Sequence, residues 1–213
     1  MAQLLCVNRQ ADTPVCLFTM DSRASGRYCC RPQTQKEMIQ KIDIQSVKDR
    51  QYGDFKALYG SSFPIFEQRT EEQQAWAFEQ AEYHLAGYMD EGKWIGFISY
   101  WEFDTYIYIE HFAIDGALRG QGYGSRVLRM FVEQKGKTVL LEIDPIVDEV
   151  SAARLRFYTH CRFQTNPYSH RHPAYIEGYQ PHPLVVLAAP DAISEEAYLR
   201  FYHDLCERVM GQH

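Results

Sequence analysis

Apolar positions along the chain alternate or run together in short segments that predict β-strands. Three such segments, at 84–89, 94–103 and 105–115, follow one another closely. The first two are separated by Asp90-Glu91-Gly92-Lys93, which is typical of a hairpin turn. The segment 138–143 is nearly all apolar, as expected for a central strand covered on both faces. The middle of the chain is therefore predicted to form a sheet.

Helix signals separate these strands. The segment 166–183 is rich in Pro, His and Tyr and is predicted as loop and strand edge. Thr70 is followed three residues later by Gln73, the spacing of a capping box. Helices are predicted at 50–59, after Thr70, at 125–134, at 149–161 and after Ser194, and the remaining strands at 41–47, 163–168 and 184–188.

Composition narrows the class of protein. The chain has 213 residues, of which 46% are apolar and 14% aromatic, so it is expected to be globular with one main domain. Its formal charge of -6, without a long basic run, argues against a nucleic-acid partner. No apolar run is long enough to span a membrane, and the start of the chain does not resemble a secretory signal.

The first 37 residues differ from the rest, because they contain four of the six cysteines and no regular hydrophobic period. We expect a disordered tail rather than a metal or redox module, and a true start at Met38 is an open alternative. The cysteines form no CxxC pair, so they match neither a zinc site nor a disulfide framework. A reducing, cytoplasmic location is the simplest interpretation.

The segment 105–115 leads into a glycine-rich turn, Arg119-Gly120-Gln121-Gly122-Tyr123-Gly124, that opens a predicted helix. Glycines at every second position let several backbone N–H groups point to one spot, and the helix start adds more N–H groups. Such a turn is an anion site, most often for phosphate. A tight strand-to-helix turn without a ligand is the alternative.

Two common phosphate loops do not fit this turn. No Lys follows the glycines as in a Walker loop, and the dinucleotide fingerprint needs a glycine where Ser125 stands. The spacing Q/R-x-x-G-x-G/A does fit, at Arg119, Gly122 and Gly124. It resembles the pyrophosphate-binding loop of the Gcn5-related N-acetyltransferases, the GNAT family. The predicted order of elements over 39–188 also resembles that family.

The resemblance implies a fold and a division of the chain. The GNAT fold is a mixed α/β fold with a mostly antiparallel sheet of six or seven strands, splayed at its centre and flanked by helices. We expect the tail at 1–37, the acetyltransferase domain at 38–190, and a C-terminal helix at 191–213 that is packed on the domain or at a dimer interface.

The reaction that the resemblance implies is attack of an amine on the thioester of acetyl-CoA, an acyl-donor substrate. A Lys-like amine is neutral roughly once in 2,500 molecules at pH 7, and recovering the neutral form costs about 4–5 kcal/mol. Glu110, on the strand that enters the loop, is the expected base, with a pKa raised by aromatic neighbours. Strand alternation places it on the face of Tyr106 and Tyr108 and places His111, the reserve base, on the other face unless the strand bulges.

The segment 151–163 resembles the family pattern N-x-x-A-x-x-L/F-Y-x-x-x-G-F. This match implies that Tyr158 is the general acid that protonates the CoA thiolate. Ser151, Arg154 and Tyr158 would form one helical stripe facing the cofactor. Ser151, Arg154 and Arg162 replace the usual Asn, Ala and Gly, which weakens the match.

The remaining binding residues are implied by position in the family. Main-chain groups of Phe112 and Ile114 would face the thioester and the pantetheine arm. The expected cofactor-binding residues are Phe112, Ile114, Arg119, Gly120, Gln121, Gly122, Tyr123, Gly124, Ser125, Ser151 and Arg154.

The acceptor is expected between the first helix pair and the late strands, with Phe63, Glu67, Arg69 and Tyr175 as binding residues. Glu67 would grip a cationic acceptor, or Arg69 an anionic one. Three histidines at 170, 172 and 182 lack the spacing of a metal site, so no metal is expected. The predicted function is N-acetylation of a small-molecule amine by a monomer or homodimer. The alternatives are peptide or protein acetylation and a non-catalytic acyl-CoA sensor.

Overall fold

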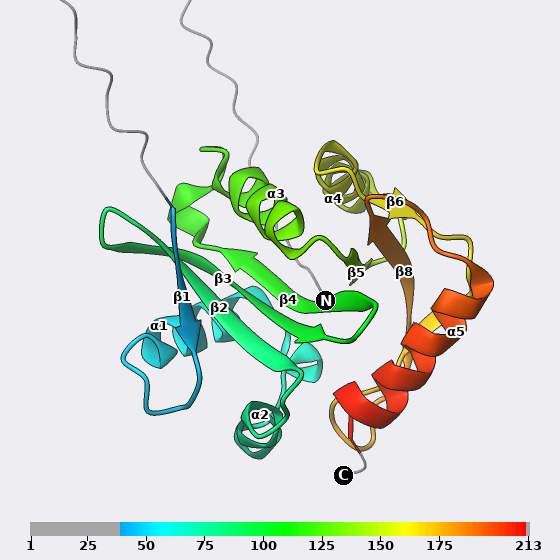
Figure 1. Ribbon diagram of the computed structural model, residues 1–213, viewed down its shortest axis with the longest axis horizontal. Helices are drawn as coiled ribbons and strands as arrows, with labels where there is room; N and C mark the ends of the chain where they lie inside the picture. The colour runs from blue at the N-terminus through cyan, green and yellow to red at the C-terminus, as the bar shows by residue number, and fades with distance from the viewer. Residues whose placement is uncertain (1–38, 212–213) are drawn as a thin grey trace, which may run out of the picture.

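A computed structural model describes residues 39–211, and its elements follow the predicted order closely (Figure 1). The predicted tail at 1–37 lies outside the described residues. The strands are β1 (Gln40–Ile44), β2 (Tyr83–Asp90), β3 (Lys93–Glu102), β4 (Tyr106–Ile114), β5 (Thr138–Ile143), β6 (Gln164–Thr165), β7 (His170–His172) and β8 (His182–Ala189). The helices are α1 (Tyr52–Ser62), α2 (Glu71–Phe78), α3 (Tyr123–Lys135), α4 (Glu149–His160) and α5 (Glu195–Asp204), with short turns η1 (Ile65–Glu67), η2 (Gly116–Leu118) and η3 (Leu205–Val209).

The strands form an eight-stranded sheet in the order β1-β2-β3-β4-β5-β8-β6, with β7 paired to β8. Every pair is antiparallel except β4 and β5, which run parallel. The mixed α/β, mostly antiparallel fold is therefore confirmed. The extra strand, β7, comes from the stretch predicted as loop and strand edge. The predicted strand at 163–168 shrinks to β6, because Pro167 has no N–H to donate.

The two central strands separate, and this separation creates the site. Pairing of β4 with β5 covers only Tyr106–Tyr108 against Thr138–Leu140. From Ile109 onward β4 pairs with β3 alone, so its other edge turns away from β5. The gap between the two halves of the sheet is visible in Figure 1. The predicted splay of the central strands is therefore present.

A β-bulge lies at the start of this splayed segment. Ser99 pairs with His111 and Tyr100 with Ile109, so Glu110 is the extra residue. Glu110 and His111 consequently both reach Tyr175, on the same face of the sheet. The bulge is the alternative left open for this strand, and because it breaks the period of two, His111 does not point to the opposite face.

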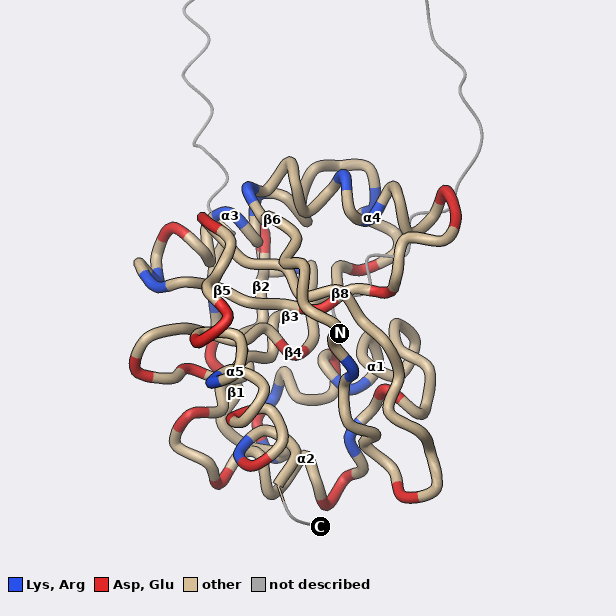
Figure 2. The backbone as a smooth tube through the Cα atoms, turned by 90° about the vertical axis from the view of Figure 1, so that its right-hand side faces the viewer, with Lys and Arg blue, Asp and Glu red and all other residues tan. Residues whose placement is uncertain are grey.

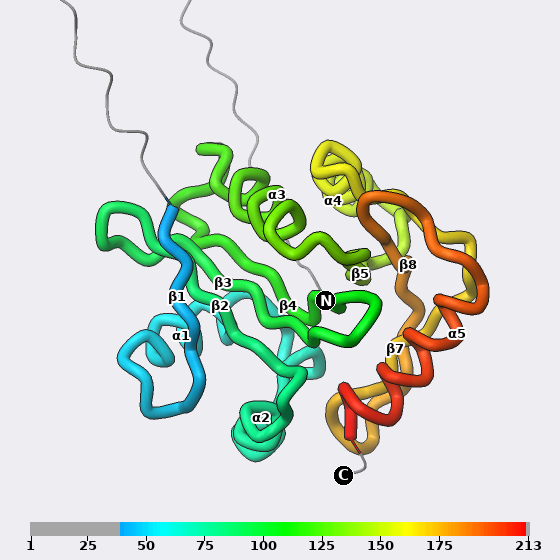
Figure 3. The backbone as a smooth tube through the Cα atoms, viewed as in Figure 1, coloured from blue at the N-terminus to red at the C-terminus, as the bar shows by residue number. Residues whose placement is uncertain are grey.

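Helices cover both faces, as the tube in Figure 3 also shows. Apolar residues of α1, α2 and α5 pack on one face, while α3 and α4 pack on the other. On α3, Val127, Leu128 and Phe131 are buried, and each buried apolar side chain contributes about 1.5–3 kcal/mol. In the view of Figure 2, Lys and Arg are interspersed with Asp and Glu over the described residues rather than gathered in a stripe.

The C-terminal segment belongs to the same core. Tyr198 and Phe201 of α5, together with Leu205 and Val209 of η3, are buried in the cluster on the α1–α2 face. The Arg69 Nη2 donates a hydrogen bond of 2.7 Å to the carbonyl of Val209. The end of the described chain is therefore attached to the segment that precedes α2. Its part in a dimer stays a prediction.

Candidate acetyl-transfer site

The glycine turn has the geometry of an anion cradle. Gly120 and Gly122 adopt left-handed backbone angles, with φ of 77° and 79°, which other residues rarely adopt. Gly122 is the N-cap of α3 and provides no side-chain cap, so the first N–H groups of α3 are left for a ligand. A Cβ built on either glycine meets no atom within 4 Å, so both face open space. These features fit a diphosphate.

A pocket of about 260 Å³ lies against this turn. Its other walls are Ile114 at the end of β4, Leu118 of η2 and Phe157 of α4. Neighbouring side chains of the turn are held away from the cradle: the Gln121 amide donates to the Ala117 carbonyl at 3.2 Å, and the Ser125 hydroxyl to the Gly122 carbonyl at 3.1 Å. The turn therefore offers mainly backbone groups to a ligand, while Arg119 is exposed beside it.

The free edge of β4 continues from this pocket. Phe112 and Ile114 pair with Ile98 and Gly96 of β3, while their other side faces the splay. Both side chains are buried, and the ring of Phe112 stacks on Phe157 of α4 at 6.5 Å. An extended ligand arm can pair with such an edge as an added strand. The backbone of β4 thus connects the glycine turn to the centre of the sheet.

Helix α4 forms the opposite wall. Ser151, Arg154 and Tyr158 are its buried residues, as the predicted stripe requires. The Ser151 hydroxyl donates to the Asp148 carboxylate at 2.7 Å in the capping box of α4, so the structure engages it in holding the helix start. Arg154 forms an ion pair with Asp144, and its buried Nε has no hydrogen-bond partner among residues 39–211.

Tyr158 is completely buried between α4 and the sheet. Burial raises the pKa of its phenol above the ordinary value, so the group stays protonated at neutral pH. A phenol that stays protonated is available as a proton donor, as the predicted general-acid role requires.

Glu110 does not have the environment that the sequence suggested. Its Oε1 accepts hydrogen bonds from Arg69 Nε at 2.8 Å and from the Tyr175 hydroxyl at 2.9 Å, and its Oε2 accepts one from Trp101 at 2.8 Å. Burial by itself raises the pKa of Glu110, but the Arg69 guanidinium and the Trp101 hydrogen bond outweigh it and hold the pKa well below its usual range. The expectation of a raised pKa is therefore wrong.

His111 is also held inside the protein. Its Nε2 lies 3.0 Å from the carbonyl of Glu67, to which it donates, and its Nδ1 lies 3.3 Å from the hydroxyl of Ser99. Burial lowers the pKa of His111 to about 3, so the ring is neutral. Phe63 packs against this ring at 4.8 Å and is itself buried, which places it in the core.

Glu67 is a second buried carboxylate in this region. It lies on η1, is 4% exposed, and interacts electrostatically with Asp144 at the end of β5 and with Arg154 of α4. Burial, reinforced by the negative charge of Asp144 and opposed by Arg154, raises its pKa to about 7. A carboxylate with a pKa near neutrality is suited to accept a proton at physiological pH.

The four predicted acceptor residues therefore have three different environments. Arg69 and Tyr175 join Glu110 in one buried network, in which the Arg69 guanidinium also lies over the rings of Trp101 and Tyr175. Phe63 lies in the core beside His111, and Glu67 interacts electrostatically with Asp144 and Arg154 of the other half of the protein. The predicted alternative in which Arg69 binds an anionic acceptor gains no support, because the guanidinium is buried and paired with Glu110.

Sequence reasoning missed two contributors to this region. The sequence does not single out Asp144, although it directly follows β5, whose carboxyl end borders the splay. Phe66 was not considered, yet its ring stacks on Tyr179 at 6.0 Å and connects η1 to the loop between β7 and β8. The signal for Phe66 was its position between Pro64 and Glu67, in a segment already expected near the acceptor.

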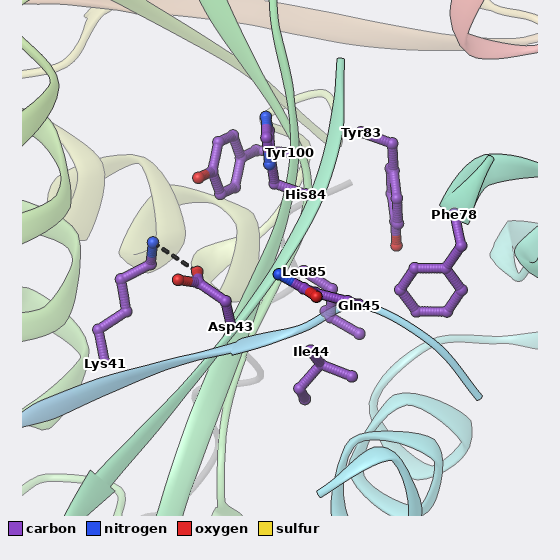
Figure 4. A pocket seen from close by; sticks show the side chains of 9 residues that line it. All are labelled: Lys41, Asp43, Ile44, Gln45, Phe78, Tyr83, His84, Leu85 and Tyr100. Carbon is purple, nitrogen blue, oxygen red and sulfur yellow. Dashed lines mark ion pairs between the residues drawn. The ribbon is translucent and has the colours of Figure 1, made fainter. Parts of the chain in front are cut away.

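Figure 4 shows a different pocket, of about 480 Å³, at the edge of β2. It is lined by β1, β2 and α2 together with Tyr100 of β3, and it contains the Lys41–Asp43 ion pair of 2.7 Å. Neither the glycine turn nor α4 lines it. It therefore lies outside the site formed by the splay.

Comparison with known proteins identifies the family. The sequence matches the Acetyltransferase (GNAT) family over residues 49–163, more than half of the chain. A solved structure from Bacteroides thetaiotaomicron, described as a candidate GNAT-family acetyltransferase, is 30% identical, has a TM-score of 0.77, and covers 82% of this chain and 100% of that chain. The chain therefore belongs to the GNAT acetyltransferase family, as the glycine turn predicted.

Two further relatives agree with this assignment. The candidate acetyltransferase YjbC of Bacillus subtilis (strain 168) is 34% identical over 77 residues, which is 35% of this chain and 39% of that protein. A Bacillus subtilis acetyltransferase solved in complex with CoA is 13% identical, with a TM-score of 0.52 over 71% of this chain and 97% of that chain, and it shows likeness of fold.

Residues 39–211 contain neither a membrane-spanning helix nor a group of metal-ligating side chains. No helix within 39–211 is both long and apolar enough to cross a membrane. No three His, Cys, Asp or Glu side chains in the same range are grouped as ligands for a metal ion.

Proposed function

We propose that this chain transfers an acetyl group from acetyl-CoA to a primary amine of a small molecule, by direct attack in a ternary complex. The observation that carries the proposal is the splay between β4 and β5, with an anion cradle at one end of the β4 edge. Glu67 of η1 adds a buried carboxylate that interacts electrostatically with Asp144 and Arg154, which lie across the splay.

Each wall of the splay has a distinct part in donor binding. The N–H groups at the start of α3 and the left-handed glycines hold the diphosphate of CoA. The backbone edge of Phe112 and Ile114 pairs with the pantetheine arm and supplies N–H donors to the thioester oxygen. This places the acetyl carbon between β4 and α4, where Tyr158 is buried.

Proton transfers complete the reaction. The acceptor enters as an ammonium ion and gives a proton to Glu67. Its nitrogen then forms a bond to the acetyl carbon and loses its second proton to solvent, and the carbon–sulfur bond breaks to leave the amide and the CoA thiolate. Tyr158 gives its proton to the departing thiolate, and a later proton from Glu67 or solvent restores the phenol. We assign proton removal to Glu67 rather than Glu110, because the Glu110 carboxylate is already bound by three donors.

A thiol-release assay with acetyl-CoA against polyamines, amino acids, aminoglycosides and peptides tests the proposal, with calorimetric titration of CoA alongside. CoA binding together with acetylation of a small amine supports it. Acetylation of peptides alone would indicate the alternative, a peptide or protein acetyltransferase. Binding without any turnover would indicate an acyl-CoA sensor, and absence of CoA binding would remove the basis of all three.

Replacing Gly122 with Val is expected to weaken CoA binding about tenfold or more, because a branched side chain disfavours the left-handed conformation and projects into the cradle. Calorimetric titration of CoA measures the effect. Gly136→Val is a matched control, since Gly136 is also left-handed, with φ of 62°, but caps the other end of α3. Equal loss of affinity in both variants would show that strain alone, and not the cradle, is responsible.

Replacing Tyr158 with Phe is expected to lower kcat by about 10–100-fold while CoA affinity changes little, because general acid catalysis typically contributes this much or more. Steady-state kinetics and a CoA titration separate the two quantities. Phe157→Leu tests whether any change on this helix has the same effect, since Phe157 lines the pocket without an ionisable group. An unchanged kcat in Tyr158→Phe would exclude the phenol as the acid.

A further inference from the structure

Exposed apolar side chains gather on the acceptor side of the splay. Among residues 39–211 eight large hydrophobic residues are exposed, and five of them belong to three short segments. These segments are η1, the loop between β5 and α4, and the loop between β7 and β8. The five residues, which we call the apolar rim, are Ile65, Phe66, Ile146, Val147 and Tyr179.

A ring contact and an electrostatic interaction connect these three segments near Glu67. The ring of Phe66 stacks on Tyr179 at 6.0 Å, with an interplanar angle of 24°, which joins η1 to the loop between β7 and β8. Glu67, the next residue after Phe66, interacts with Asp144, two residues before Ile146. The apolar rim therefore borders the carboxylate to which we assign proton removal.

The charges beside the rim favour a cation. Glu67 and Asp144 are both acidic, and Arg154 compensates only one of them. His182 lies edge-on to Phe66 at 6.4 Å, and burial lowers its pKa, so it adds no positive charge near pH 7. Aromatic faces also attract ammonium groups. A carboxylate on the acceptor would instead approach two negative side chains.

We propose that the acceptor is an amphiphilic primary amine, whose ammonium group meets Glu67 while an aromatic or branched apolar group packs on the apolar rim. This inference rests on the proposed function and names its substrate class. A single exposed apolar residue needs no explanation, but clustering beside a functional carboxylate indicates a binding surface. Burying a phenyl group there favours binding, because apolar surface leaves water.

Three matched probes test the proposal: 2-phenylethylamine, ethylamine and phenylalanine. We expect kcat/KM for 2-phenylethylamine to exceed that for ethylamine by about tenfold or more, since one buried apolar group discriminates by roughly 10–200-fold. Phenylalanine has the same ring with an added carboxylate, and we expect it to be the poorer substrate of the two aromatic amines. Equal values for the first two probes would overturn the proposal.

Phe66→Ala identifies the surface involved. It is expected to lower kcat/KM for 2-phenylethylamine about tenfold and to leave ethylamine nearly unchanged, because only the aromatic probe reaches the rim. Leu199→Ala, at an exposed apolar residue on α5 outside the rim, is the control and should change neither. A Phe66→Ala effect that is the same for both amines would overturn the assignment.

Binding measurements distinguish failure of this inference from failure of the proposed function. Calorimetric titration of 2-phenylethylamine and ethylamine into the protein saturated with CoA reports acceptor binding without turnover. A preference for the aromatic amine that disappears in Phe66→Ala, without acetylation, would support the rim and reject the transfer reaction. Acetylation of both amines at equal efficiency, with equal binding, would support the reaction and reject the rim.

Discussion

Glu67→Gln is expected to lower kcat/KM for an amine acceptor by about 10²–10⁴-fold, the usual contribution of a positioned general base. The amide has nearly the shape of the carboxylic acid but cannot accept the ammonium proton. Because Glu67 lies on η1 and not in the glycine turn, CoA affinity should stay the same. Steady-state kinetics with a small amine and calorimetry with CoA measure the two effects. Glu177→Gln, in the exposed loop between β7 and β8, is the matched control.

The pH dependence separates loss of a base from loss of a binding contact. Burial raises the pKa of Glu67 to about 7, so the active, ionised form increases as the pH rises through that value. Because the acceptor binds as an ammonium ion, we expect kcat/KM of the unmodified protein to rise through pH 7 and then to level until the ammonium ion itself is lost near its pKa of about 10. Glu67→Gln should lose the rise near pH 7, and its residual activity should increase only as free neutral amine forms toward pH 10. A variant that keeps the rise through pH 7 would reject Glu67 as the base.

The sequence indicated the glycine turn correctly because its conformation is local. Left-handed angles at Gly120 and Gly122 depend on the absence of a Cβ, and the start of α3 follows directly. The order of strands and helices could also be predicted from the sequence, because the hydrophobic period and the capping signals each depend on only a few neighbouring residues. Thr70 caps α2 with Gln73 as its partner in the capping box, as its spacing predicted.

Glu67, the base that we propose, could not be identified by the same reasoning. Strand alternation gives the face of Glu110 but not its partners, and Arg69 lies 41 residues earlier in the chain. The bulge that brings Glu110 and His111 to one face leaves no clear sign in the sequence. Whether an acidic side chain acquires a raised or a lowered pKa depends on such distant neighbours. The aromatic neighbours of Glu110 therefore predicted a raised pKa, whereas its pKa is lowered. The carboxylate with the raised pKa is Glu67.

The Arg69–Glu110 pair should be essential for stability. Arg69→Met is expected to lower the free energy of unfolding by about 3–5 kcal/mol, because it leaves a buried carboxylate without its counter-charge. Both side chains are almost completely buried, at 2% and 0% exposure, so solvent screens the pair little. The variant also loses the hydrogen bond to the Val209 carbonyl that anchors the C-terminal segment. Urea unfolding at pH 7 measures the change, with Arg156→Met on the exposed face of α4 as control.

The pH dependence of unfolding should reverse sign in that variant. With Arg69 present, the pKa of Glu110 in the folded protein lies below its unfolded value of 4.5. The ionised Glu110 carboxylate therefore contributes its full stabilisation of the fold above pH 4.5, and this contribution is lost as the pH falls toward the folded pKa. Without Arg69, burial dominates and raises the folded pKa above 4.5, so the carboxyl favours folding when protonated and its contribution is lost as the pH rises. The stability difference between the two proteins should therefore shrink as the pH is lowered from 7 to 4. A difference independent of pH would show that lost packing and the Val209 hydrogen bond, rather than the charge of Glu110, account for the destabilisation.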